Sequence, residues 1–87
     1  MFRLWGKIWK DNRMIQDTVI CDDSNRSRTD KVFSALDEII LQFNLSSPIW
    51  LKSTIREFQR FDKVRFSQDH FIDSIDFDYL EIHVIEE

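Results

Sequence analysis

The chain has 87 residues, of which 43% are hydrophobic and 14% aromatic, and its formal net charge is −4. A chain of this length makes one domain at most, residues 1–87, and its hydrophobic fraction excludes wholesale disorder. One Gly and one Pro argue against glycine-rich phosphate-binding loops, and no apolar run is long enough for a signal peptide or a membrane span.

Residues 2–10 and 13–21 predict a β-hairpin, closed by Asp11 and Asn12, which tolerate the positive φ of a tight turn. Pairing Lys10 with Arg13 sorts the apolar side chains onto one face of this hairpin. That face would carry Phe2, Leu4, Ile8, Ile15, Val19 and Cys21. The opposite face would carry Arg3, Trp5, Lys7, Trp9, Met14, Gln16, Thr18 and Ile20.

After a polar loop over 22–28, a helix is expected to begin at Thr29 or Asp30, either of which can cap it. Its apolar stripe comprises Val32, Phe33, Leu36, Ile39, Ile40 and Phe43. A second helix is predicted to follow, with Ser47 as its cap and Pro48 at its first position. Trp50, Leu51, Ile55, Phe58 and Phe61 would share its buried face.

Residues 67–75 predict a short turn or helix, and residues 77–85 predict a strand that buries Leu80, Ile82 and Val84. The expected fold is therefore α+β, in the order β-β-α-α-β, with a three-stranded sheet and two helices on one face. Its core would join Ile8, Ile15, Val19, Leu36, Ile40, Phe58 and Ile82. Along most of its length the sequence resembles short uncharacterised proteins of Gram-positive anaerobic bacteria, which implies a cellular setting and no particular activity.

The most informative feature is the helix-free face of the hairpin, where Trp5 and Trp9 stand beside Arg3 and Lys7, with Met14 nearby. Monomeric proteins rarely leave such an apolar patch uncovered, and Trp, Met and Arg are favoured in interfaces. We therefore expect a non-enzymatic interaction module that self-associates, most simply as a homodimer.

Three alternatives for this face stay open. The loop 22–28 or the segment 67–75 would bury both indoles if it folded across them. Bases stacked on Trp5 and Trp9, with phosphates on Arg3 and Lys7, would instead make a nucleic-acid surface. Residues 2–13 also approximate the spacing of a membrane-surface helix, although Gly6 and the hairpin register argue against it.

The charges are distributed unevenly along the chain. Residues 48–66 hold five cations against two anions, and Lys52, Arg56 and Arg60 form a basic helix stripe that is the second candidate for nucleic acid. Residues 67–87 hold seven acidic residues and no Lys or Arg. Opposite charge predicts that the stripe and this acidic tail lie near each other.

No pattern of residues indicates catalysis. The single cysteine, Cys21, cannot form an internal disulfide, which suits a reducing cytoplasm, and its predicted place on the buried face would leave it inert. The only grouping that resembles a metal or acid–base site is Asp69, His70, Asp73 and the Asp76–Asp78 pair, which we interpret as surface acidity. We expect no enzyme activity, cofactor, metal or membrane partner.

Overall fold

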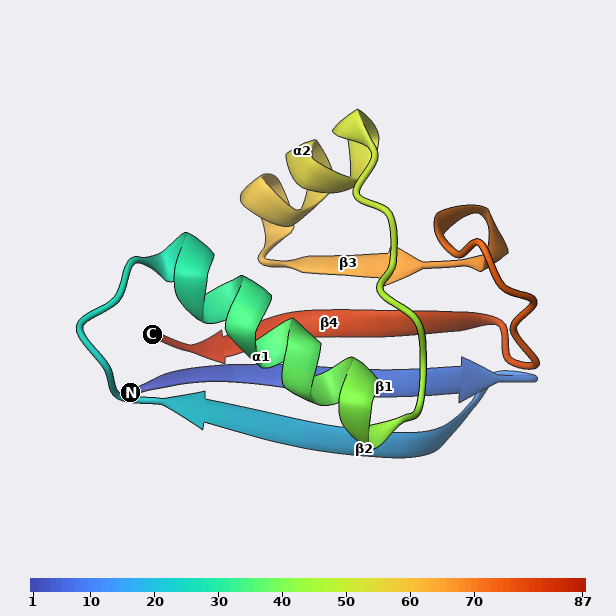
Figure 1. Ribbon diagram of the computed structural model, residues 1–87, viewed down its shortest axis with the longest axis horizontal. Coiled ribbons are helices and arrows are strands. Elements are labelled where there is room, and N and C mark those ends of the chain that lie inside the picture. Colours follow the sequence, from blue (N-terminus) through green and yellow to red (C-terminus); the bar gives the residue numbers. More distant parts are fainter.

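The computed structural model describes residues 1–87 and builds an α+β fold around a four-stranded antiparallel sheet (Figure 1). Its elements are β1 (Phe2–Lys10), β2 (Arg13–Asp22), α1 (Arg28–Gln42), α2 (Lys52–Phe61), β3 (Lys63–Phe66), the 3₁₀ helix η1 (Gln68–His70) and β4 (Tyr79–Glu86). The strand order is β2-β1-β4-β3. Both helices lie on the same side of the sheet, with α1 over β1 and β2 and α2 beside β3 (Figure 1).

The predicted α+β class is confirmed, but the expected count of three strands is wrong because β3 was missed. β3 has only four residues and follows α2 after one residue, so its two apolar side chains resemble the end of the helix. Asp62 separates the two elements with a φ of 57°, a left-handed conformation that turns the chain back. Val64 then pairs with Ile82, and Phe66 with Leu80, against β4.

The hairpin is confirmed, and Lys10 and Trp9 pair with Arg13 and Met14 as predicted, but the predicted register fails beyond Met14. Asp11 and Asn12 adopt φ values of 53° and 64°, as a two-residue hairpin loop requires. A β-bulge then inserts one extra residue into β2, so that Ile8 pairs with Gln16 instead of Ile15. The predicted face of every later β2 residue is therefore reversed.

The bulge changes which β2 residues enter the core. Ile20 pairs with Leu4 and is buried, whereas Val19 and Cys21 are exposed on the opposite face and Ile15 is half-exposed. The placement of Ile15, Val19 and Cys21 among buried residues was thus wrong. Neighbouring positions 19 and 20 are both apolar, so either register buries one of them, and alternation alone does not distinguish the two.

The N-cap of helix α1 lies two or three residues before the predicted caps, Thr29 and Asp30. Ser27 is the N-cap, and its Oγ accepts a hydrogen bond of 3.2 Å from the backbone N–H of Asp30, while Thr29 and Asp30 lie in the first turn. The apolar stripe buries Val32, Leu36, Ile39 and Ile40 and half-buries Phe43. Phe33 lies at the edge of the stripe and stays half-exposed.

Helix α2 begins later than predicted, at Lys52, and neither Ser47 nor Pro48 belongs to it. Residues 45–51 run without helical structure, and the N–H of Ile49 donates to the carbonyl oxygen of His70 at 2.6 Å. Of the predicted buried face, Leu51, Ile55 and Phe61 are exposed, Phe58 is buried, and Trp50 is half-buried before the helix starts. The Trp50 ring packs edge-on against Phe33, Phe58 and Phe66 at centroid distances of 5.7, 5.7 and 5.1 Å.

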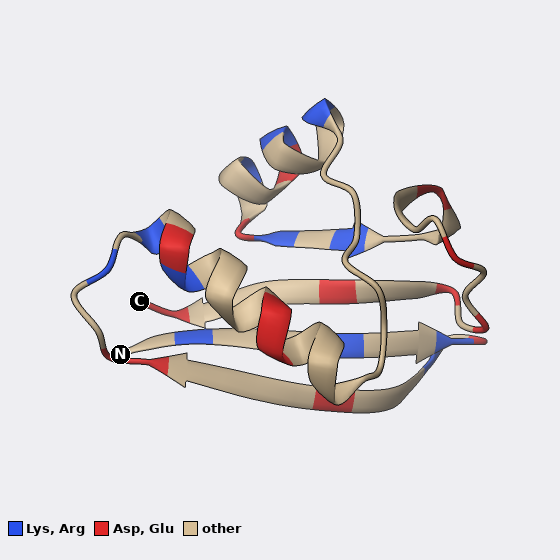
Figure 2. Cartoon of the chain, viewed as in Figure 1, with Lys and Arg blue, Asp and Glu red and all other residues tan.

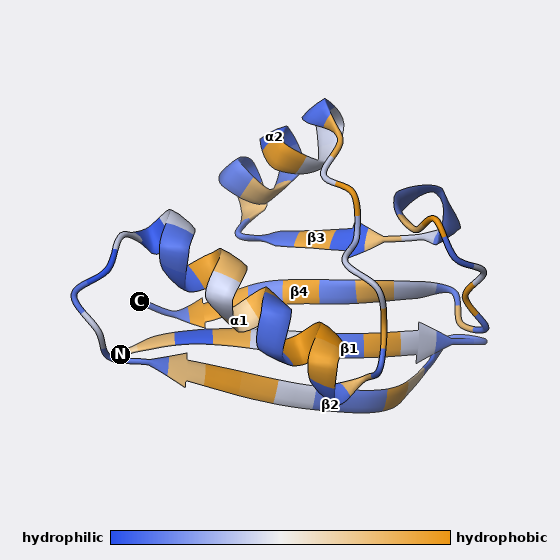
Figure 3. Cartoon of the chain, viewed as in Figure 1, coloured by the Kyte–Doolittle hydropathy of each residue, from blue (hydrophilic) through white to orange (hydrophobic).

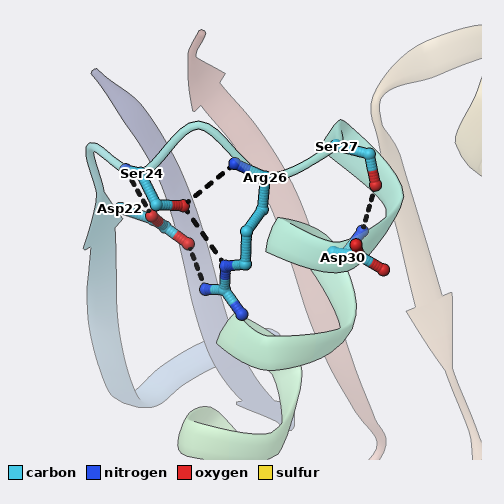
Figure 4. A network of polar contacts seen from close by, with 5 residues as sticks. All are labelled: Asp22, Ser24, Arg26, Ser27 and Asp30. Carbon is cyan, nitrogen blue, oxygen red and sulfur yellow. Dashed lines mark hydrogen bonds and ion pairs between the residues drawn. The ribbon is translucent and has the colours of Figure 1, made fainter.

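A polar network orders the loop between β2 and α1 (Figure 4). Asp22 accepts from the backbone N–H of Ser24 at 2.8 Å and from the Arg26 guanidinium at 2.6 Å, and Arg26 also donates to the Ser24 hydroxyl. Hydrogen bonds from Ser24, with a smaller contribution from Arg26, lower the pKa of Asp22 to about 2. The loop is therefore held at the end of β2 and does not depend on apolar contacts.

The core lies between the helices and one face of the sheet, where the apolar bands of α1 and the strands meet (Figure 3). The most deeply buried side chains are Leu4, Ile39, Val64, Phe66, Leu80 and Ile82. Of the predicted core, Ile8, Leu36, Ile40, Phe58 and Ile82 are buried as expected. The predicted burial of Leu80, Ile82 and Val84 on β4 is also confirmed.

The only glycine of the chain sets how closely α1 approaches the sheet. Gly6 lies in the middle of β1, and a Cβ built there would lie 2.7 Å from Cγ2 of Ile39, closer than real Cβ atoms come to other side chains. Ile39 is fully buried at this point of α1 and has little room to move. The absence of a side chain at position 6 therefore allows the helix to lie directly on the central strand.

We expect Gly6→Ala to lower the free energy of unfolding by roughly 1–3 kcal/mol, because the added methyl group overpacks the contact with Ile39. Ile39→Val alone should cost about 0.5–1.5 kcal/mol. The double variant should lose less than the sum of the two, since the smaller residue makes room for the methyl group. Urea denaturation measures all three, and a Gly6→Ala variant at least as stable as the parent would contradict the close approach.

Candidate functional site: the open face of the sheet

The sheet face opposite the helices, which we call the open face, contains most of the functional residues predicted from the sequence. It is made by alternate residues of the four strands, as the register of the ladders dictates. These are Arg3, Trp5, Lys7 and Trp9 of β1, Met14, Asp17, Val19 and Cys21 of β2, Lys63 and Arg65 of β3, and Tyr79, Glu81, His83 and Glu86 of β4. All five predicted interaction residues, Arg3, Trp5, Lys7, Trp9 and Met14, are among them.

A row of alternating charge crosses the open face from one edge of the sheet to the other. Lys7 of β1 pairs in register with Asp17 of β2 and with Glu81 of β4, and Glu81 pairs with Arg65 of β3. In the order of the strands the signs are negative, positive, negative and positive, visible as alternating bands in Figure 2. We call these four residues the charge row.

Glu81 is the centre of the charge row and is buried although no helix covers it, with a residue exposure of 4%. Its carboxylate accepts hydrogen bonds from Lys7 Nζ at 3.1 Å, from Trp9 Nε1 at 3.3 Å and from Arg65 Nε at 3.3 Å. Burial by itself raises the pKa of this carboxyl, but the hydrogen bonds and charges of Lys7 and Arg65 outweigh it and hold the pKa below its ordinary value. Glu81 therefore remains ionised at neutral pH.

The two indoles point away from the helices, as predicted, and their ring and indole N–H contacts are with side chains of the open face. Lys7 Nζ lies 3.8 Å from the centroid of the Trp5 ring, and Trp5 Nε1 donates to Asp17 at 2.9 Å. Trp9 donates to Glu81 and lies 6.3 Å from the Tyr79 ring. Both indoles are left half-buried. These contacts involve neither the loop 22–28 nor the segment 67–75.

Two further residues of β4 complete the open face. Burial, followed by the charges of Lys7 and Lys63, lowers the pKa of His83, so its imidazole is neutral at neutral pH. Glu86 accepts from Arg3 Nε at 2.7 Å, with both side chains about half-exposed. The face thus combines aromatic rings, a buried ion pair and exposed charges, and no nucleophile is paired with a base.

Sequence reasoning missed several residues of the open face, for two separate reasons. Lys63 and Arg65 belong to the unrecognised strand β3, although the period-two alternation of residues 63–66 was a usable signal. Asp17 and Val19 reached the open face through the bulge in β2, which no residue pattern announces. The strand that contains Glu81 was predicted, but Glu81 lies beside Lys7 only because β4 pairs with β1, and the strand order was not predicted.

The second predicted site, the basic stripe, lies elsewhere. Lys52, Arg56 and Arg60 are exposed on α2, and none of them takes part in an ion pair. The acidic tail pairs with other cations, including Arg28, which binds Glu87 at 2.6 Å. No ion pair therefore forms between the basic stripe and the acidic tail, although their opposite charges predicted that they would lie near each other. The alternative of a membrane-surface helix over 2–13 is overturned, because these residues form β1 and its turn.

Two residues of the predicted acidic grouping, Asp78 and His70, make structural hydrogen bonds. Asp78 accepts from the backbone N–H of Asp11 at 2.9 Å and so supports the hairpin turn. His70 contacts Thr54 Oγ1 at 3.0 Å through Nε2 and accepts from the Ser67 N–H through Nδ1, which places its ring proton on Nε2. No group of three His, Cys, Asp or Glu residues is arranged to hold a metal ion.

The hollows of the surface are small. The largest has a volume of about 250 Å³ and lies between the bulge and residues 43–45 and 76–77. Pockets for small molecules usually measure roughly 300–1,000 Å³. A groove of about 180 Å³ between α1 and α2 is lined by Val32, Phe33, Trp50, Ile55 and Phe58. Neither helix is long and apolar enough to cross a bilayer.

Comparisons of the chain with protein-family models, with curated proteins and with solved structures find no match.

We expect Glu81→Gln to lower the free energy of unfolding by on the order of 3 kcal/mol at neutral pH, because it leaves the buried Lys7 ammonium without its carboxylate. The folded-state pKa of Glu81 lies below the ordinary value of 4.5. Its ionised form therefore stabilises the fold above that value, and this contribution is lost as the pH falls through the folded-state pKa. The difference in the free energy of unfolding between the parent and Glu81→Gln should therefore become smaller as the pH falls.

The matched control is Glu86→Gln, which makes the same change on the same strand and face at a half-exposed pair with Arg3. It should cost at most about 1 kcal/mol. Denaturant unfolding at several pH values compares the two variants. If Glu81→Gln and Glu86→Gln lower the free energy of unfolding by the same amount, the centre of the open face is not a buried ion pair.

Proposed function

We propose that the protein is a non-enzymatic interaction module of the cytoplasm that self-associates through its open face. The observation that carries this proposal is the one-sided arrangement of the fold. α1 and α2 both lie on one side of the sheet, while Trp5, Trp9, Met14 and Val19 stand partly exposed on the other (Figure 1). A partly covered aromatic face on a small domain is typical of a protein-binding surface.

Apolar burial supplies the driving force for association. A Trp ring offers roughly 150–250 Å² of surface, worth about 25 cal/mol for each Å² removed from water. Each indole is only half-buried within the chain, so a partner would cover the remainder. The indole N–H groups already donate to Asp17 and Glu81, which means that covering the rings leaves no indole donor without an acceptor.

The same contacts weigh against a stacking surface for nucleic acid on this face. Lys7 occupies one side of the Trp5 ring, where a base would stack, and its ammonium is committed to Glu81. The net charge of −4 gives no general attraction to phosphate. Binding of a folded protein surface fits these half-covered rings better.

Nucleic-acid binding through α2 is the alternative proposal. Lys52, Arg56 and Arg60 recur every four residues, are exposed, and are free of ion pairs. A salt-dependent shift of mixed DNA and RNA that is lost in a Lys52→Ala/Arg56→Ala/Arg60→Ala variant would favour this alternative.

The test of the main proposal is the mass of the protein in solution. Light scattering or sedimentation across a range of concentrations should show a dimer that dissociates on dilution. Trp5→Thr/Trp9→Thr should remain folded and become monomeric, because the apolar centre of the open face is removed. Val19→Ser/Met14→Ser, which leaves both indoles in place, should weaken the dimer as well.

The control is Leu41→Ser/Ile72→Ser, which removes two of the most exposed apolar side chains of the chain, both away from the open face. It should leave the association unchanged. A parent protein that is monomeric at every concentration, or a control that weakens the dimer as much as the open-face variants do, would overturn the proposal.

A further inference from the structure

The charge row identifies the partner of the open face and the way in which it docks. We infer that the occupant is a second copy of this chain, packed face to face about a two-fold axis that runs parallel to the strands between β1 and β4. This inference rests on the proposed self-association. It adds the orientation of the two copies and the pairs of residues that meet.

The geometry follows from the strand order β2-β1-β4-β3. Rotation about an axis parallel to the strands places β2 over β3 of the second copy and β1 over its β4, with each cross-strand row staying level. Asp17 then faces Arg65 of the second copy, and Lys7 faces its Glu81. Lys7 and Glu81 are buried and paired within each chain, so the contacts that the interface adds are those of the exposed ends of the row, where Asp17 meets Arg65 of the second copy once on each side of the axis.

Two other rows obey the same rule, whereas the row of Trp5 places Trp5 over His83 and Val19 over Lys63 of the second copy. Arg3 of β1 and Glu86 of β4 are register partners, so the rotation places each over its opposite charge in the second copy. Trp9 and Tyr79 are likewise partners, and each ring faces the other kind across the interface. Such matched potentials fix the register of an interface.

A two-fold axis lying along the charge row, across the strands, gives the opposite result. It would place each strand over its own copy, with Asp17 over Asp17 and Arg65 over Arg65, the two exposed members of the row. Like charges placed in contact disfavour a complex strongly. The alternation therefore selects the axis parallel to the strands, and aligned packing of this kind is common between sheets.

The size of the face supports a second copy as a sufficient partner. Strands about 4.8 Å apart and a rise of roughly 3.3 Å for each residue from Arg3 to Trp9 give a projected face of roughly 400 Å². Two such faces project to roughly 800 Å², and the side chains that stand above the sheet add accessible surface, so the buried area approaches the lower end of the range of stable interfaces. An interface of this size is typical of a dimer that dissociates on dilution.

The experiment uses two charge reversals, Asp17→Arg and Arg65→Glu. Each reversal creates two like-charged contacts in the homodimer, one on each side of the axis, and should weaken dimerisation roughly tenfold or more. In an equimolar mixture, the new arginine of one chain faces the new glutamate of the other, while the unchanged Arg65 faces the unchanged Asp17. The mixture should form a one-to-one heterodimer at concentrations where each variant alone is monomeric.

Arg65→Glu places a second carboxylate beside Glu81, so a pair of milder variants guards against misfolding. Val19 lies over Lys63 of the second copy in this arrangement, and both are exposed within one chain. Val19→Glu and Val19→Lys lose the same apolar contact and differ only in sign. The glutamate variant should dimerise several times more tightly than the lysine variant, and Lys63→Gln should abolish that difference.

The outcomes separate this inference from the function on which it rests. Recovery of the heterodimer in the mixture supports the arrangement. A parent dimer that Trp5→Thr/Trp9→Thr dissolves, but whose charge-reversed variants do not recover on mixing, overturns the arrangement and leaves the proposed function standing. A dimer insensitive to Arg65→Glu and to the sign at position 19 overturns it too. A parent that never dimerises overturns both.

Discussion

A buried carboxylate on a sheet face without helices is the constraint on which the account of this protein depends. Glu81 lies on a central strand, and only side chains of the open face are available to cover it and to donate to it. Lys7, Trp9 and Arg65 do so, and Lys7 in turn lies against Trp5. The ion pair and the two indoles therefore form one connected network. This explains why large rings occupy a sheet face that would carry small polar residues if it were fully solvated.

The opposite face follows a simpler rule, which the sequence alone largely reveals. Alternation over residues 2–10 and 77–85 and the apolar stripe of the first helix predicted β1, β4 and α1, because burial of one face imposes its period on each element. Gly6 was visible as the only glycine, but the residue above it, Ile39, emerges only from the packing. Helix α2 was predicted to start too early, because Pro48 suits a helix start and an extended segment equally well.

The open face was only half predictable, for reasons that are physical. Trp5 and Trp9 were assigned correctly because the alternation of β1 buries Phe2, Leu4 and Ile8 on its other face. The charge row could not be predicted, since it needs the bulge that brings Asp17 opposite Lys7 and the strand order that places Glu81 between Lys7 and Arg65. Local alternation assigns a residue to a face, whereas register and strand order decide which charges become neighbours.

The central claim is that the open face binds the open face of a second copy. Amide NMR spectra recorded over a series of dilutions test it most directly. Diluting the parent protein should shift the amide resonances of the open face, led by Lys7, Asp17, Arg65 and Glu81, and leave those of the α1–α2 groove unchanged. Shifts confined to the groove or to the outer edge of β2, or no shifts with dilution, would contradict the account.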